Sequence, residues 1–402
     1  MYITAMTHRD KLFDLTLRWL NDDFRPEDGK TITRIFVYES AISAVLVDQV
    51  IGWLVHLFQR PLVRERIRQK HALRWRLIDH LPRQTPRIGH LIQDFQQNPE
   101  YFFPRLPIDA LFITTEDSNL AAIGRVKRLS RVAEKVSFRL VDALFQEIQI
   151  QARRFATQRA AATGVLLEDL LSSEKEMQND FVAAETYVAR RFRNHNVSIP
   201  RQALTINDLM GFKIIGDQAL IEEIPDIIDH WPGFTLLETE RHTGDYNAVN
   251  LLVEVMLPDA EELVAQVKGF DWSVAQRRGL DRQETEDGFL DYLKQGSDSV
   301  RMEIILTTYD ELMESEFGRS IHELRILRLR QRQPYSGPIA QNAAYLIEYM
   351  LTLAASPAVD VFELPIKMYG RYLPETIDSA KGVLFGQDMD GGLLDAFCLK
   401  KA

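Results

Sequence analysis

The stretch of sequence that decides the fold reads Asn207-Asp208-Leu209-Met210-Gly211-Phe212-Lys213-Ile214-Ile215. Residues 212–215 are apolar apart from Lys213 and predict a buried strand. Asp208 precedes that strand on a turn, and Gly211 lets another backbone approach closely. Mg²⁺ takes one or two protein carboxylates plus substrate oxygens, so a carboxylate at a strand entrance is suited to a metal-bound phosphate. The alternative is an ordinary turn aspartate, followed by a strand lysine that extends to solvent.

The sequence around this stretch alternates between helical and extended patterns. We expect strands at residues 234–241, 248–256 and 300–306, and helices at 221–231, 311–332 and 341–353, with a mixed tail at 359–402. Residues 1–110 are interpreted as mainly helical, with a basic helix after Pro61, and residues 120–190 as helical again. This order predicts an α+β fold, with a mixed β-sheet flanked by helices and a largely helical N-terminal region.

Length and charge limit the classes of protein that fit. At roughly 150 residues a domain, 402 residues predict two or three domains, or one α/β core with large helical additions. We place the boundaries at residues 1–110, 111–332 (with a helical insertion at about 140–195) and 333–402. The net charge of −10 argues against coating of DNA phosphates but allows a local basic pocket.

The single cysteine, Cys398, excludes an internal disulfide and any cysteine-based metal site. No apolar signal core follows Met1. The most apolar stretch, residues 37–58, is interrupted by Glu39, Asp48 and His56, which favours a buried helix over a membrane span. We therefore expect a cytoplasmic protein with no membrane partner.

Two further stretches carry polar residues on expected strands. Tyr246, Ala248 and Asn250 fall on one face of an alternating run, where a tyrosine could stack on a base. Glu303 lies within an apolar strand, where a carboxylate is costly unless it is paired or bound to metal. Their alternative interpretations are a partly buried strand-edge tyrosine and a glutamate paired with a neighbouring arginine.

In this order the motifs resemble the nucleotidyltransferase domain of the RelA/SpoT family of (p)ppGpp synthetases. The family's Asp-x-x-Gly-x-Arg motif matches Asp208, Gly211 and Lys213, and its Tyr-x-Ser-x-His motif corresponds to Tyr246, Ala248 and Asn250. Its Glu-x-Gln-Ile-x-Thr motif matches Glu303 in part. Its Glu-Phe-Gly-x-x-x-His motif matches Glu316, Phe317, Gly318 and His322. The matched region covers roughly residues 200–330, and Ala248, Asn250 and Lys213 depart from the family pattern.

The family's ATP-side motif precedes the aspartate strand. Its nearest counterparts here are Arg125, Lys127, Ser130 and Lys135. The serine comes one position early, and the gap to Asp208 is longer than in the family. The same stretch also fits an amphipathic helix with solvated charges.

The resemblance implies a domain that binds ATP and a guanine nucleotide with Mg²⁺ and moves pyrophosphate onto a ribose 3′-hydroxyl. Asp208 would hold Mg²⁺, and Glu303 would assist the metal or accept the hydroxyl proton. Tyr246 would stack on the acceptor base, and Lys213 would neutralise phosphates. Asn250, His322, Arg125, Lys127, Ser130 and Lys135 would complete the nucleotide site.

Three functions stay open at this point. The first is a divergent pyrophosphokinase of this type, acting on a nucleotide or RNA acceptor. The second is an inactive module of the same fold, which senses a nucleotide or docks a protein partner through its helical N-terminal region. The third is RNA association through the arginine-rich segment at residues 64–76.

Overall fold

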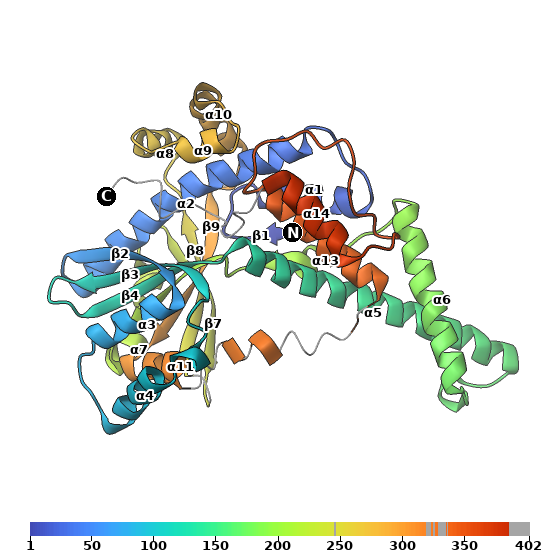
Figure 1. Cartoon of the computed structure of the whole chain (residues 1–402), viewed down its shortest axis with the longest axis horizontal. Coiled ribbons are helices and arrows are strands. Elements are labelled where there is room, and N and C mark those ends of the chain that lie inside the picture. Colours follow the sequence, from blue (N-terminus) through green and yellow to red (C-terminus); the bar gives the residue numbers. More distant parts are fainter. Residues whose placement is uncertain (245–246, 319–322, 325, 329–334, 336, 386–402) are drawn as a thin grey trace.

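The computed structural model describes residues 1–244, 247–318, 323–324, 326–328, 335 and 337–385. Its centre is a mixed sheet of seven strands in the order β2-β3-β4-β6-β9-β8-β7 (Figure 1). β6 and β9 run parallel, and the other neighbouring pairs are antiparallel. The strands are β2 (Leu62–Gln69), β3 (Pro107–Thr115), β4 (Leu120–Val126), β6 (Met210–Ile215), β7 (Phe234–His242), β8 (Ala248–Met256) and β9 (Ser299–Thr307). A small parallel pair joins β1 (Tyr2–Ile3) to β5 (Thr205–Ile206).

Alternation along the strands divides the apolar side chains between two cores. Phe212 and Ile304 face the larger core, with residues of α2 (Asp28–Phe58), α7 (Gln218–His230) and α13 (Pro338–Leu353). Phe112 and Ile123 face a smaller core, with residues of α3 (Lys70–Asp79), α4 (Pro86–Gln97) and α11 (Tyr309–Phe317). The smaller core covers only part of its face of the sheet. The polar side chains of β6, β8 and β9 lie on that same face.

Two long helices form an arm that begins in the larger core and extends away from the sheet (Figure 1). They are α5 (Leu129–Thr163) and α6 (Glu174–Arg193), and Ser173 and Glu176 begin α6 with a reciprocal capping box. The remaining helices are α1 (Arg9–Leu20), α8 (Ala260–Val267), α9 (Ser273–Arg277), α10 (Arg282–Gln295) and α14 (Pro374–Phe385), with short 3₁₀ turns at Pro99–Phe102, Leu167–Asp169 and Arg201–Leu204.

The α+β class is confirmed, with a mixed sheet and N-terminal helices. The strands that we expected at 234–241, 248–256 and 300–306 correspond to β7, β8 and β9. The expected helix at 311–332 corresponds at its start to α11, which ends at Phe317. Much of the remaining range lies outside the described residues. The proposed domain boundaries remain a prediction; β2, within residues 1–110, is an edge strand of the main sheet.

Two helical expectations were wrong. The basic segment after Pro61 is strand β2 followed by helix α3. Arg64, Arg66 and Arg68 recur at every second residue, which is the period of a strand. Residues 120–126 form strand β4, which is buried on both faces along most of its length. The apolar run at residues 120–123 is too short for its periodicity to distinguish a strand from a buried helix.

Helix α2 is long and apolar enough to cross a membrane by length and composition, with a mean hydropathy of 1.7 in its most apolar window. In the structure, its residues from Ile32 to Leu54 supply much of the larger core. A core helix passes the same test of composition. The cytoplasmic location therefore stays a prediction.

Candidate functional site

Two acidic residues lie on the neighbouring parallel strands β6 and β9 or directly beside them. Glu303 of β9 is the register partner of Gly211 of β6, and Asp208 lies in the turn just before β6. A Cβ atom at Gly211 would lie 2.6 Å from the carbonyl oxygen of Glu303. Glycine therefore permits the close approach of these two strands.

Two lysines hold the carboxylate of Asp208. Lys127, just after β4, places Nζ 2.9 Å from Asp208 Oδ2, and Lys135 of α5 pairs with the same oxygen. The three side chains are 21–28% exposed, so the cluster is open to solvent. Burial alone would raise the pKa of Asp208, but Lys127 and Lys135 hold it well below its ordinary value. Asp208 is therefore ionised at neutral pH.

Glu303 is in a different environment. Burial raises the pKa of Glu303, and the negative charge of Asp208 adds to that effect, although Lys127, Lys135 and Lys213 oppose it. Asn250 of β8 donates from Nδ2 to Glu303 Oε1 at 3.4 Å. Among the described residues, the buried Oδ1 of Asn250 has no hydrogen-bond partner. An amide oxygen without a hydrogen-bond partner therefore belongs to the residue that contacts Glu303.

Two further cations lie on the same face of the sheet. Register pairs Arg125 of β4 with Gly211, and Lys213 lies two residues further along β6. Burial, together with the nearby charge of Arg125, lowers the pKa of Lys213 to about 8. Arg125 Nη2 lies 3.2 Å from Glu316 Oε1. The face therefore presents a row of cations next to Asp208 and Glu303.

The structure does not place every expected site residue in this cluster. Ser130 is exposed in the first turn of α5, and Ala248 is buried at the start of β8. Tyr246 and His322 lie outside the described residues, so their expected roles remain predictions.

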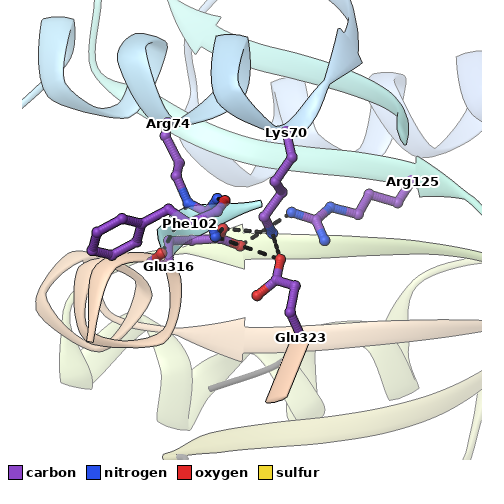
Figure 2. Close-up of polar contacts among 6 residues, drawn as sticks. All are labelled: Lys70, Arg74, Phe102, Arg125, Glu316 and Glu323. Carbon is purple, nitrogen blue, oxygen red and sulfur yellow. Dashed lines mark hydrogen bonds and ion pairs between the residues drawn. The ribbon is translucent and has the colours of Figure 1, made fainter. Parts of the chain in front are cut away.

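A buried ionic network lies behind the cluster, and the sequence did not predict it (Figure 2). Lys70 pairs with Glu316 Oε2 at 2.5 Å and with Glu323 Oε1 at 3.2 Å. Arg74, one turn further along α3, donates from Nε to the backbone oxygen of Glu316 at 2.9 Å. Burial opposes ionisation of Glu316, but Lys70 and Arg125 hold its pKa well below the ordinary value. Lys70 and Arg74 belong to the segment that the sequence offers for RNA association, but both side chains are buried.

The possible ligands fit a shared magnesium site better than a site made by protein alone. Within the described ranges, no group of three or more His, Cys, Asp or Glu side chains could hold a metal ion. Asp208, Glu303 and the unpartnered Asn250 oxygen are hard oxygen donors. Mg²⁺ is commonly held by one or two carboxylates together with substrate phosphates. Asp208, Glu303 and Asn250 are therefore the residues here that could hold such an ion.

The comparisons with known proteins give a structural match but no sequence match. No family model matches it, and no curated protein matches its sequence. Among solved structures it matches the small alarmone synthetase 1 from Bacillus subtilis, at 18% sequence identity over 42% of this chain and 71% of that chain. The TM-score of that match is 0.20, which is too low to support an argument about shared architecture.

Proposed function

We propose that this protein is a nucleotide-binding phosphotransferase of RelA/SpoT type, which transfers pyrophosphate from ATP to a nucleotide or RNA acceptor with Mg²⁺. One observation carries the proposal. Four cations from three separate segments, Arg125, Lys127, Lys135 and Lys213, gather around Asp208 and Glu303 on one face of the sheet. Such a site neutralises a phosphate chain, and phosphoryl transfer depends mostly on positioning and charge neutralisation.

Each side chain has a role that follows from its surroundings. Asp208 stays ionised, and with Glu303 it would hold Mg²⁺, which would neutralise charge on the phosphates. Lys127 and Lys135 would exchange Asp208 for phosphate oxygens when a nucleotide binds. In the alternative role, Glu303 is not bound to the metal, and its raised pKa suits it to accept the proton of an acceptor hydroxyl.

The second candidate is an inactive nucleotide sensor. It is favoured by Lys127 and Lys135, whose ion pairs with Asp208 compete with binding of a metal ion there. It is also favoured by Ala248 and Asn250, which replace the serine and histidine of the family motif. Loss of one oriented contact in the transition state costs about 10²–10³ in rate. A sensor would keep nucleotide affinity without any transfer.

The basic segment at residues 64–76 gives RNA association little support. Arg64 pairs with Asp48, Arg66 with Asp109, and Arg76 with Glu65. These pairs neutralise much of the positive charge that phosphate binding needs. We therefore place an RNA acceptor, if one is used, at the Asp208–Glu303 face.

Transfer of labelled phosphate tests the proposed function. Purified protein is incubated with ATP labelled on its β and γ phosphates, Mg²⁺, and GTP, GDP or tRNA in turn. We expect label on one acceptor, and a loss of about 10²-fold or more in Asp208→Asn and in Glu303→Gln. The control is Asp117→Asn, which removes the same charge from an exposed pair with Arg60. Absence of transfer to all acceptors, with ATP still bound, would select the sensor.

A further inference from the structure

Glu316 connects the protein interior with the polar face of the sheet (Figure 2). One carboxylate oxygen, Oε2, lies 2.5 Å from Lys70 Nζ, and the other, Oε1, lies 3.2 Å from Arg125 Nη2. The Lys70 and Glu316 side chains are 1% and 3% exposed, whereas that of Arg125 is 32% exposed. A single buried carboxylate thus joins a fully enclosed lysine to a guanidinium that solvent can reach.

The buried end of this connection is held from several directions. Lys70 also pairs with Glu323, and Arg74 binds the backbone oxygen of Glu316 through Nε. Arg74 donates from Nη1 to the backbone oxygen of Phe102 as well, and its guanidinium lies 5.7 Å from the centre of the Phe102 ring. Both the side chain and the main chain of Glu316 are therefore fixed, and charged hydrogen bonds are strong where water is excluded.

The outer end of the connection lies where the proposed nucleotide site is. Arg125 is in register with Gly211, and Gly211 is in register with Glu303, so the three residues form one row across β4, β6 and β9. Gly211 carries no side chain, which lets the backbone of Glu303 come close to this row. An arginine has five N–H donors in a planar fork, and one of them is occupied by Glu316.

We infer that Glu316, anchored by Lys70, is a positioning residue that fixes the guanidinium of Arg125 for contact with the phosphate chain of the nucleotide. The inference rests on the proposed function. An unanchored arginine would lose side-chain freedom each time it bound a phosphate, and the buried carboxylate removes that cost in advance. Because Glu316 does not reach the reacting atoms itself, its effect should appear in affinity for ATP and not in the chemical step.

The chain contains a matched control for this role. Glu323 has the same charge, similar burial and the same partners Lys70 and Arg74, but Arg125 is paired with Glu316. Glu316→Gln and Glu323→Gln therefore each remove one anion from Lys70 and Arg74, and only the first removes the anion paired with Arg125. At a temperature where circular dichroism shows each variant folded, we expect Glu316→Gln to raise the Kd and KM for ATP about tenfold. The kcat of Glu316→Gln should stay within twofold of the wild-type value. The Kd and KM for ATP of Glu323→Gln should also stay within twofold of the wild-type values.

A double variant tests whether Glu316 acts through Arg125. In an Arg125→Ala background, Glu316→Gln should cause no further loss of ATP affinity, since its target is gone. If Glu316→Gln does not fold, Glu316→Asp keeps the charge but shortens the side chain that reaches Arg125, and it should weaken ATP binding severalfold in the wild-type background and not in the Arg125→Ala background.

The outcomes separate this inference from the proposed function. Equal losses in Glu316→Gln and Glu323→Gln, or additive losses in the double variant, would overturn the positioning role while leaving ATP binding in place. A wild-type protein that binds no ATP would overturn both.

Discussion

Asp208 and Glu303 carry the same charge in neighbouring but unlike surroundings. Lysines lower the pKa of Asp208 against the effect of burial, and burial raises the pKa of Glu303. Environments that push two pKa values apart often assign two roles to chemically similar groups. Asp208 is suited to remain an anion, and Glu303 is suited to exchange a proton.

Lys213 should make nucleotide binding depend on pH. Its pKa is lowered to about 8, from an ordinary value of 10.5. Phosphates prefer the protonated lysine, so affinity for ATP should fall as pH rises through about 8. Between pH 8 and 10.5 the unfolded chain binds more protons, so the same residue makes stability rise with pH. The measurement is calorimetric titration with ATP between pH 7 and 9.

Lys213→Arg is the control for this pH dependence. An arginine stays protonated across the whole range, so the decline near pH 8 should disappear in the variant. An identical pH profile in both proteins would show that another group titrates.

At the scale of elements, the close pairing of β6 with β9 depends on Gly211. A methyl group there would meet the Glu303 carbonyl at 2.6 Å. Gly211→Ala should therefore lower the free energy of unfolding by about 1–3 kcal/mol. Gly52→Ala is the matched change, because nothing lies within 4 Å of a Cβ atom at that position in α2. It should raise stability by about 0.4–1 kcal/mol. Urea denaturation measures both, and equal effects would contradict the close approach of the strands.

The contact between α3 and the segment that follows β9 depends on buried charge. Lys70→Met would leave Glu316 and Glu323 without their shared lysine, and removal of one partner from a buried pair costs about 3–5 kcal/mol. Arg87→Ala breaks an exposed pair with Glu314 and should change stability little. Urea unfolding compares the two variants. A Lys70→Met protein as stable as Arg87→Ala would mean that the network contributes no stability.

At the scale of the whole molecule, the alternation of apolar and polar residues predicted the strands that have one buried face and one half-buried face. β8 and β9 alternate between buried and half-buried residues, and their bounds were close to those expected. β4 is buried on both faces and was mistaken for helix, so Arg125 and Lys127 were placed on the wrong element. Lys70 and Arg74 find partners more than 240 residues away, and no local pattern contains that information. The convergence of Lys127, Lys135 and Asp208 likewise depends on the packing of distant segments.

The most direct test of the central claim is the thermal midpoint of unfolding with and without millimolar ATP and Mg²⁺. A ligand at about 100 times its Kd stabilises the folded state by about 2.7 kcal/mol. We predict a clear rise for the wild type, and loss of the magnesium-dependent part of that rise in Asp208→Asn. An unchanged midpoint with ATP, GTP and (p)ppGpp alike would contradict a nucleotide site at Asp208 and Glu303.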